Sequence, residues 1–260
     1  MASPSCIAID WSGDATERGQ RTRIVAAIVR EGRVAEVTGG RTRAEVAHWL
    51  AAMATAADPL LVGLDFSFSL PEWFAREHEC HSIEAVWELV AERAEPWLRG
   101  CAPPFWGRPG VRCELAAAAR YRVCEQQLRA RGRQPKSIFQ VGGAGAVGTG
   151  SLRGMPWLAW LRERGFAIWP FDAVGLCTAF EVYPSLFAKV ATNDAIGRAA
   201  HLTPLSHGVL GAREREAAIA SDDAFDAVVS ALAMWDRRAE LLALPRTSDA
   251  VAAIEGAVWV

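Results

Sequence analysis

Acidic residues occupy positions in this sequence from which a single carboxylate site could be assembled. A charge at the edge of a hydrophobic core is costly unless something pairs with it, so acids at strand ends serve chemistry more often than packing. Carboxylate oxygens without an accompanying His/Cys cluster suit Mg²⁺ or Mn²⁺, and two such ions can promote phosphodiester hydrolysis. The acids are Asp10 and Asp65, which each end an apolar run, Glu181, which lies inside one, and the group Asp222, Asp223 and Asp226.

The first 65 residues predict the strands that bring two of these acids together. Strands are predicted at 7–10, 24–29, 33–37 and 60–65, with an amphipathic helix at about 43–55. Thr42 and Glu45 form a capping box at the start of that helix. If the fourth strand pairs parallel to the first through a right-handed crossover, their carboxyl ends lie side by side. Asp10 and Asp65 would then be neighbours.

Residues 70 to about 136 are predicted to form a helical insertion with a strong positive charge. Residues 108–136 contain eight Lys/Arg and two Glu, in a chain whose net charge is −2. Such a patch can follow a phosphate backbone, and an equally good alternative is a solvated basic helix, predicted here at 115–130. The candidate phosphate contacts are Arg108, Arg112, Arg120, Arg122 and Arg129.

A glycine-rich segment follows a strand predicted at 137–141 and precedes a helix predicted at 156–164 and a strand at 166–169. Gly143, Gly145 and Gly148 match G-x-G-x-x-G, and Asp172 follows 24 residues after the last of them. This pattern is typical of dinucleotide binding at a helix N-terminus. The residues after Gly148 argue against a helix starting there, so a loop whose amides line the active-site cleft is favoured. Gly143 and Gly145 are therefore candidate substrate contacts.

The remaining acids lie on a strand and a helix near the C-terminus. A strand is predicted at 178–183, and Glu181 within it either needs a partner or faces water from an edge strand. Ser221 is predicted to cap the C-terminal helix, on which Asp223 and Asp226 share one face beside an apolar stripe. The helix dipole alone accounts for acids in the first turn, but less easily for Asp226.

Composition predicts a soluble single domain. The 260 residues are 51% hydrophobic, and six scattered cysteines form no C-x-x-C pair. Neither a disulfide framework nor a secretory leader is indicated, and no apolar run approaches the roughly 18 residues of a membrane span. We therefore expect one domain over residues 1–260, located in the reducing cytoplasm, with no membrane partner. The oligomeric state is left open.

The order of these elements resembles the ribonuclease H-like fold, and in particular its Holliday-junction-resolvase-like branch. Four strings are similar to signature blocks of domain-of-unknown-function family 429 (DUF429), predicted RNase H-like nucleases: residues 9–13 (IDWSG), 62–71 (VGLDFSFSLP), 181–184 (EVYP) and 222–227 (DDAFDA). The chain departs from the family after Asp65, where Phe-Ser-Phe-Ser replaces a frequent aliphatic pair. The resemblance implies an α/β fold whose mixed sheet has three antiparallel strands and then parallel ones, flanked by helices, with the insertion at 70–136.

A nuclease acting on nucleic acid with Mg²⁺ or Mn²⁺ is the predicted function. Asp10 would bridge the metals, Asp65 and Asp226 would complete their shells, and Glu181 or Asp223 would hold a ligand or orient water. The candidate catalytic residues are thus Asp10, Asp65, Glu181, Asp223 and Asp226, and Ser12 and Ser67 are further candidate substrate contacts.

Other classes of protein remain open. The same fold underlies actin-like phosphotransferases and ATPases, in which residues 10–16 could form a phosphate-gripping hairpin, although those proteins generally need two such domains. A non-catalytic binding scaffold is a third possibility, since fold does not fix function. A zinc site at the cluster of residues 78–81 (His78, Glu79, Cys80 and His81) with Cys101 or Cys113 is weaker, because paired ligands at zinc spacing are absent.

Overall fold

The computed structural model describes residues 3–54, 58–143, 145–191 and 193–260. Its strands are β1 (Ser5–Asp10), β2 (Val25–Arg30), β3 (Arg33–Thr38), β4 (Leu60–Leu64), β5 (Ala167–Ile168) and β6 (Cys177–Glu181). Its helices are α1 (Glu17–Arg23), α2 (Arg43–Met53), α3 (Glu72–Glu77), α4 (Ile83–Gly100), α5 (Val123–Ala130), α6 (Gly148–Arg162), α7 (Ala195–Leu202), α8 (Ala212–Ala220), α9 (Asp222–Asp236), α10 (Arg238–Ala243) and α11 (Ala252–Glu255), with short 3₁₀ turns at Ala118–Arg120 and Pro184–Leu186.

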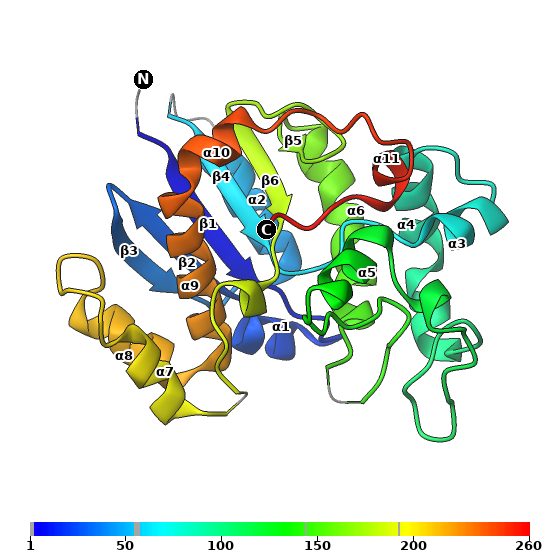
Figure 1. The fold of residues 1–260 in the computed structure, drawn as a ribbon, viewed down its shortest axis with the longest axis horizontal. Helices are drawn as coiled ribbons and strands as arrows, with labels where there is room; N and C mark the ends of the chain where they lie inside the picture. Colours follow the sequence, from blue (N-terminus) through cyan, green and yellow to red (C-terminus); the bar gives the residue numbers. More distant parts are fainter. Residues whose placement is uncertain (1–2, 55–57, 144, 192) are drawn as a thin grey trace.

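These strands form one mixed sheet in the order β3-β2-β1-β4-β6-β5 (Figure 1). β1, β2 and β3 pair antiparallel, whereas β1, β4, β6 and β5 run parallel to their neighbours. The predicted ribonuclease H-like α/β sheet is therefore confirmed. So is the parallel pairing of β1 with β4, which places the carboxyl ends of the two strands side by side.

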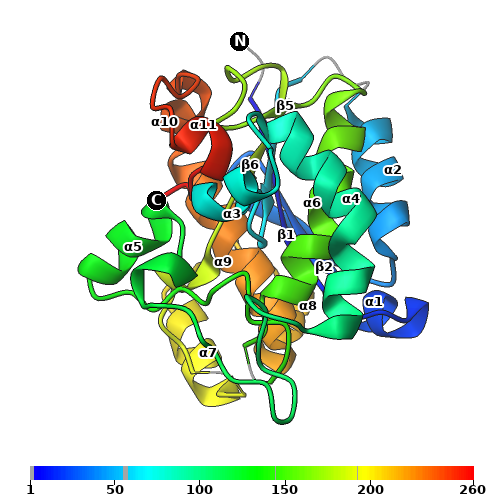
Figure 2. The same cartoon turned by 90° about the vertical axis from the view of Figure 1, so that its right-hand side faces the viewer.

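Side chains alternate between two cores, one on each face of the sheet. In β1, Ile7 and Ile9 belong to the core that the sheet shares with α2, α4 and α6, whereas Cys6 and Ala8 belong to the core beneath α9. Figure 2 shows α4 and α6 on one side of the sheet and α9 on the other. The fold thus has three layers. Whether a strand residue faces α4 and α6 or faces α9 depends on its place in the alternation along the strand.

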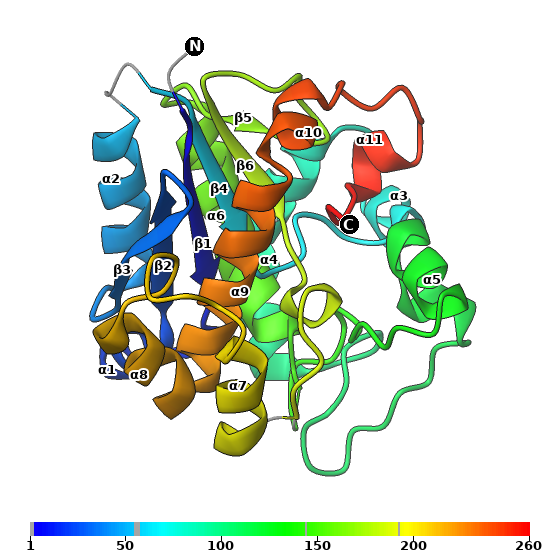
Figure 3. The same ribbon diagram turned by 60° about the vertical axis from the view of Figure 1, so that its left-hand side comes forward.

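Helix α9 packs closely along β1 and β2, and Figure 3 shows it running opposite to β1, with its first turns following α8 at the carboxyl end of that strand. Gly63 in β4 makes this packing possible. A Cβ at that position would stand 2.6 Å from the sulfur of Met234 and 2.8 Å from a methyl of Val182. Both distances are shorter than real Cβ contacts, so the close approach of α9 to β4 depends on this glycine.

Three predicted elements differ from those observed. Residues 137–141 form a turn with a single bridge at Gln140 rather than a strand. Helix α6 begins at Gly148, eight residues before the predicted start, because the amide of Gly148 bonds to the carbonyl of Gln140 and that of Ser151 to Val147. The predicted helix at 115–130 is reduced to a 3₁₀ turn and α5.

Residues 70–136 contain α3, α4 and α5 and no strand. Helix α4 packs on α6, and its buried residues belong to the same core as β1 and β4. The N-terminus of α4 is capped by Ser82, whose hydroxyl accepts a hydrogen bond from the amide of Ala85. This helix therefore contributes to the main hydrophobic core, whereas α5 lies beside the carboxyl ends of the strands (Figure 1).

Candidate functional site

The alternation of β1 and β4 directs two acids toward α9. Side chains alternate between the two faces of a strand, so Asp10 lies on the same face as Cys6 and Ala8, and Asp65 lies on the same face as Leu61. Cys6, Ala8 and Leu61 belong to the core beneath α9. Asp223 and Asp226 lie in the first turns of α9, whose N-terminal cap is the hydroxyl of Ser221, as predicted. Four half-buried carboxyl groups therefore meet between two strand ends and one helix: Asp10, Asp65, Asp223 and Asp226.

Asp10 is the central member of this acidic cluster. Its carboxyl group lies within hydrogen-bonding reach of both Asp65 and Asp223, and its single proton can serve one of these two neighbours at a time. Burial and then the negative charges of Asp65, Asp223 and Asp226 raise the pKa of Asp10 well above its usual range. Asp10 therefore keeps a proton that its neighbours share.

The neighbours of Asp10 also ionise with difficulty. Burial, followed by the charge of Asp226, raises the pKa of Asp65 to about 8, although the hydrogen bond from Asp10 acts in the opposite direction. Burial and the charges of Asp222 and Asp223 raise the pKa of Asp226 to about 7. Burial raises the pKa of Asp223 as well, against the hydrogen bond from Asp10 and the nearby charge of Arg23. The cluster repels itself when ionised.

Asp222 has partners of its own outside the cluster, although its charge still acts on Asp223 and Asp226. Its carboxylate forms an ion pair with Arg198, which is 5% exposed, and accepts a bond of 2.9 Å from the amide of Asn193. The charge of Asp222 is therefore compensated on the outer side of α9. Asp223, and not Asp222, is the first-turn acid that faces Asp10.

Thermal stability should fall as the pH rises from about 4 toward about 8. Over this range the unfolded aspartates have released their protons while the folded cluster retains them, so the folded state loses stability with each step in pH. Asp65→Asn should therefore stabilise the protein at pH 8.5 by several degrees in melting temperature, since about 1 kcal/mol moves a domain of this size about 2–4 °C. The gain should vanish near pH 4.

Calorimetric or circular-dichroism melting across this pH range checks the expectation. Asp236→Asn, an exposed aspartate at the end of α9, is the matched control and should give no gain that grows with pH. A difference between Asp65→Asn and wild type that is the same at every pH would contradict mutual repulsion within the cluster.

Glu181 lies on the opposite face of the sheet. It pairs in register with Leu64, and its own parity is that of Cys177 and Ala179, which belong to the α4–α6 core. It is 3% exposed, so the alternative of a water-facing edge residue is wrong. Its carboxylate accepts 2.8 Å bonds from the amide of Phe68 and from a guanidinium nitrogen of Arg122. Glu181 is therefore bonded to Arg122 and Phe68 rather than to the aspartates, although its negative charge adds to the rise in the pKa of Asp65 and it lines the same cavity.

Arg122 is fully buried, which corrects its assignment as a phosphate contact. Its guanidinium pairs with Glu181 and, at 2.8 Å, with Glu125, and it also donates to the carbonyl of Glu255 at 3.0 Å. A buried charge persists only when it is paired and hydrogen-bonded, and here two carboxylates and a carbonyl supply that pairing. Arg122 thereby joins α5 to β6 and to the C-terminal segment.

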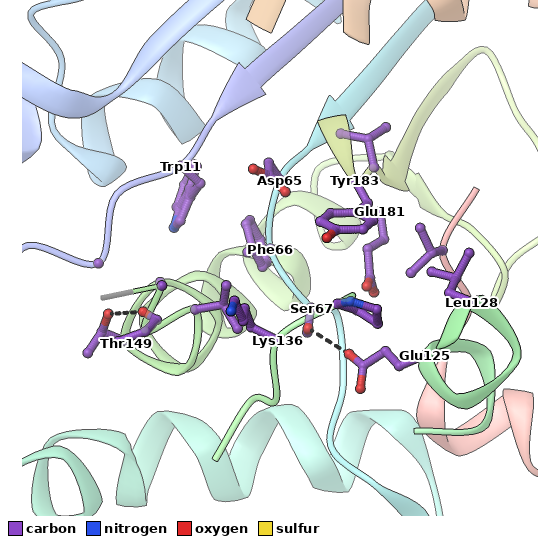
Figure 4. Close-up of a pocket in the computed structure, with 18 residues that line it drawn as sticks. Trp11, Asp65, Phe66, Ser67, Glu125, Leu128, Lys136, Thr149, Glu181 and Tyr183 are labelled. Carbon is purple, nitrogen blue, oxygen red and sulfur yellow. Dashed lines mark hydrogen bonds between the residues drawn. The ribbon is translucent and has the colours of Figure 1, made fainter. Parts of the chain in front are cut away.

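Two cavities adjoin the acidic cluster. The first, of about 230 Å³, lies at the carboxyl ends of β4 and β6 and includes Asp65 and Glu181 among its walls. The second, of about 340 Å³, is lined by Asp10 and Asp223. Both are bounded by Trp11, Gly13, Ala146 and Thr149. Figure 4 shows the first cavity, with Trp11 and Asp65 on one side and Lys136 and Thr149 across from them.

Some predicted substrate contacts line these cavities. Ser12 lines the second and Ser67 the first, although the hydroxyl of Ser67 is 3.4 Å from Glu125 and its amide donates to Ser151. Gly145 lines the first cavity, whereas Gly143 does not. The arginines of the insertion do not line either cavity: Arg108, Arg112 and Arg129 are exposed, and Arg120 donates to the carbonyl of Leu115.

The residues of the dinucleotide-binding pattern and of the proposed phosphate-gripping hairpin have structural roles instead. Asp172 pairs with Arg162 at 2.6 Å and accepts the amide of Ile168, so it is not a free ribose-binding acid. The residues directly before the glycine-rich segment do not form the strand that a dinucleotide-binding motif requires. Helix α6 does begin at Gly148, where no helix start was expected. Residues 10–16 lead into α1, with Thr16 as its N-cap, rather than forming a hairpin.

A metal site is not preformed. Across the described residues, no three His, Cys, Asp or Glu side chains are arranged so that they could hold a metal ion as they stand. This includes the zinc alternative, whose Cys80 instead donates to the carbonyl of Ala85. The acidic cluster nevertheless has the hard oxygen donors that Mg²⁺ and Mn²⁺ prefer, and its shared protons are what a bound cation would displace.

Sequence reasoning missed Trp11, Lys136 and Thr149, which surround the glycine-rich end of the first cavity. One signal was available for Lys136, because it is one of only two lysines in a chain whose other basic residues are arginine. Trp11 follows Asp10 directly but resembles any core tryptophan in sequence. Nothing in its local sequence indicates that its indole borders a cavity.

The sheet and the acids at its carboxyl edge define an α/β protein of ribonuclease H-like architecture. The chain belongs to the family described as protein of unknown function DUF429, whose model matches residues 9–250. No curated protein and no solved structure matches it. None of the helices in the described part of the chain has the length and apolar character needed to cross a bilayer.

Proposed function

We propose that this protein is a divalent-metal-dependent nuclease that hydrolyses phosphodiester bonds at the acidic cluster. The observation that carries the proposal is the meeting of Asp10 and Asp65 with Asp223 and Asp226 at the carboxyl edge of the sheet, beside two cavities. Burial together with neighbouring negative charge raises the pKa of Asp10 and of Asp65, so this arrangement of carboxyl groups does not stabilise the fold at neutral pH. Strained clusters of this kind are typical of functional sites.

Asp10, Asp65 and Asp226 would hold Mg²⁺ or Mn²⁺, which when bound supplies Lewis-acid activation of water and stabilisation of the leaving oxygen. Asp223 accepts a hydrogen bond from Asp10 and lines the second cavity, where it would orient a water molecule or a further ligand. Glu181 would not contact the metal or the substrate. It would hold the backbone that follows Asp65 in place. Paired with Arg122, it fixes residue 68 and with it the segment that follows Asp65.

Nucleic acid is the proposed substrate because a basic residue lines each cavity and further arginines are exposed on the insertion. Lys136 lines the first cavity and Arg23 the second. Arg108, Arg112 and Arg129 are exposed on the insertion, where they are available to phosphates outside the cavities. Such contacts would make binding depend steeply on salt concentration. We also propose a cytoplasmic location, which the six free cysteines support.

Divalent ions should stabilise the folded protein. A ligand that binds only the folded state at a hundred times its dissociation constant adds about 2.7 kcal/mol, which is about 5–10 °C in melting temperature for a domain of this size. Thermal melts with and without Mn²⁺ or Mg²⁺ measure this. Asp10→Asn and Asp65→Asn should each remove most of the gain, whereas Asp236→Asn should keep it.

The function itself is tested by incubating the protein with labelled DNA and RNA, single- and double-stranded, at several Mn²⁺ and Mg²⁺ concentrations. Divalent-dependent cleavage supports the proposal. An unchanged melting temperature in millimolar divalent ion, with no cleavage of any polymer, would instead indicate a binding scaffold. Tight ATP binding without polymer binding at low salt would favour the phosphotransferase alternative.

A further inference from the structure

The indole nitrogen of Trp11 is a buried hydrogen-bond donor without a partner. Trp11 is 9% exposed, and its Nε1 has no acceptor among the described residues. The ring packs on Phe66, with centroids 5.0 Å apart, and lines both cavities. Figure 4 shows the indole projecting from the loop after β1, with its nitrogen at the end that faces the glycine-rich segment and Lys136. An unsatisfied buried donor is costly, so a donor kept in this position suggests a ligand.

The N-terminus of α6 presents further unsatisfied donors at the same place. This helix has 15 residues, and its N-cap, Val147, contributes no side-chain bond. The amides of Thr149 and Gly150 donate to no acceptor in the described part of the chain. A Cβ placed on Gly150 would lie 3.8 Å from Cδ1 of Trp11, the atom bonded to Nε1. The free amides and the free indole donor are therefore adjacent, and the helix dipole adds a partial positive charge.

Two further residues shape this corner of the cavity. Gly13 packs against the first turn of α6, where a Cβ would stand 2.4 Å from Oγ1 of Thr149 and 2.5 Å from the amide nitrogen of Gly150. Lys136 extends across Gly145, since a Cβ at Gly145 would lie 3.1 Å from its Cε. Lys136 is exposed and forms no ion pair with any described residue. The indole N–H of Trp11, the two amides and the ammonium of Lys136 thus offer donors at one end of a cavity whose walls also include Asp65, Glu125 and Glu181.

We infer that Trp11 Nε1, the amides of Thr149 and Gly150, and Lys136 form an oxyanion subsite for a tetrahedral phosphate group. Hydrogen bonds from backbone amides at a helix N-terminus and from a lysine are the donors that phosphate oxygens require. The identification of this anion as a phosphate of the substrate rests on the proposed function, because Asp65 lines the same cavity. The subsite would hold the phosphate oxygens, and the acidic cluster would face them.

The subsite is tested with inorganic phosphate on protein labelled with ¹⁵N at the tryptophan indoles. The chain has eleven tryptophans, and the resonance lost in Trp11→Phe identifies Trp11. Phosphate, added without divalent ion, should shift that resonance with saturation, whereas chloride at the same ionic strength should not. Trp11→Phe keeps an aromatic ring against Phe66 and should weaken phosphate binding, measured for wild type and variants alike by titration calorimetry, about tenfold, the loss expected for one hydrogen bond to a charged group.

Two matched controls are available in the chain. Trp259→Phe removes another buried indole N–H that has no partner, and Lys189→Gln removes the other lysine; neither should change phosphate binding. Lys136→Gln alters an exposed side chain, so the fold is not at risk, and it should weaken phosphate binding about tenfold. Phosphate that shifts other indoles but not that of Trp11, or binding that is unchanged in Lys136→Gln, would overturn the inference.

The outcome is separable from that of the proposed function. Phosphate binding is measured without metal and without turnover, whereas the nuclease proposal requires divalent-dependent cleavage. Phosphate binding at Trp11 without any cleavage would reject the nuclease and keep the subsite. Cleavage with no phosphate effect at Trp11 would reject the subsite alone.

Discussion

Asp10→Asn should lower divalent-dependent phosphodiester hydrolysis by at least about a thousandfold, equivalent to about 4 kcal/mol of transition-state stabilisation. Asp10 is the central carboxyl of the cluster, within hydrogen-bonding reach of Asp65 and Asp223, and asparagine has the same shape but one fewer anionic oxygen. Burial and its acidic neighbours keep the pKa of Asp10 well above its usual range, so asparagine replaces a neutral carboxyl of the same shape, and the folded protein should be no less stable than wild type. Loss of activity with an intact fold is therefore the expected result.

The comparison requires rates measured at saturating Mn²⁺ or Mg²⁺ together with melting temperatures. Asp226→Asn should behave like Asp10→Asn, because Asp226 faces the same cluster from α9. Asp236→Asn, on the same helix but exposed, should retain wild-type activity. Cleavage that survives in both Asp10→Asn and Asp226→Asn would place the reaction elsewhere in the molecule.

Arg122→Met should destabilise the protein by about 3–5 kcal/mol, because it leaves Glu125 and Glu181 buried without their counter-charge. All three side chains are almost completely buried, and the guanidinium is bonded to both carboxylates. Urea unfolding of the variant measures the loss. If Arg122 instead contacted substrate phosphates at the surface, the variant would remain stable and lose only nucleic-acid affinity.

A double-mutant cycle isolates the ion pair. Arg122→Met combined with Glu181→Gln should be less destabilised than the sum of the single variants by about 1 kcal/mol or more, since the second change removes one uncompensated charge. Arg129→Met, in the helix that Arg122 precedes, is the control. Arg129 is exposed and stacks on Tyr121, so its loss should cost no more than about 1 kcal/mol. Strict additivity of the two buried substitutions would contradict the pairing.

The positions of Asp10 and Asp65 could be predicted because short-range rules determine them. An apolar run ending in an acid places that acid at a strand end, and a helix before the second strand allows that strand to pair parallel to the first through a right-handed crossover. The strand pairing in the structure follows that expectation. Side chains along a strand alternate between the two faces of the sheet, and this alternation is why Glu181 points away from α9. The sequence did not show which of the two hydrophobic cores covers each face.

The basic insertion could not be interpreted from its local sequence. Arg122 lies among exposed arginines in the chain, and nothing nearby distinguishes it from them. Its burial depends on Glu181 and Glu255, which lie 59 and 133 residues further along and reach it only through the fold. Charge clusters along a sequence therefore do not indicate which of their members face solvent.

The sequence by itself determined the strands that carry Asp10, Asp65 and Glu181 and the caps at Thr42 and Ser221, because each follows from residues within one element or its immediate neighbours. Only the tertiary structure decided which acids meet. The rotation of α9 on the sheet, set by contacts such as that at Gly63, turns Asp223 toward Asp10 and Asp222 toward Arg198. The same packing brings the indole of Trp11 to the start of α6, about 140 residues away in sequence, because close approach depends on shape that no local pattern encodes.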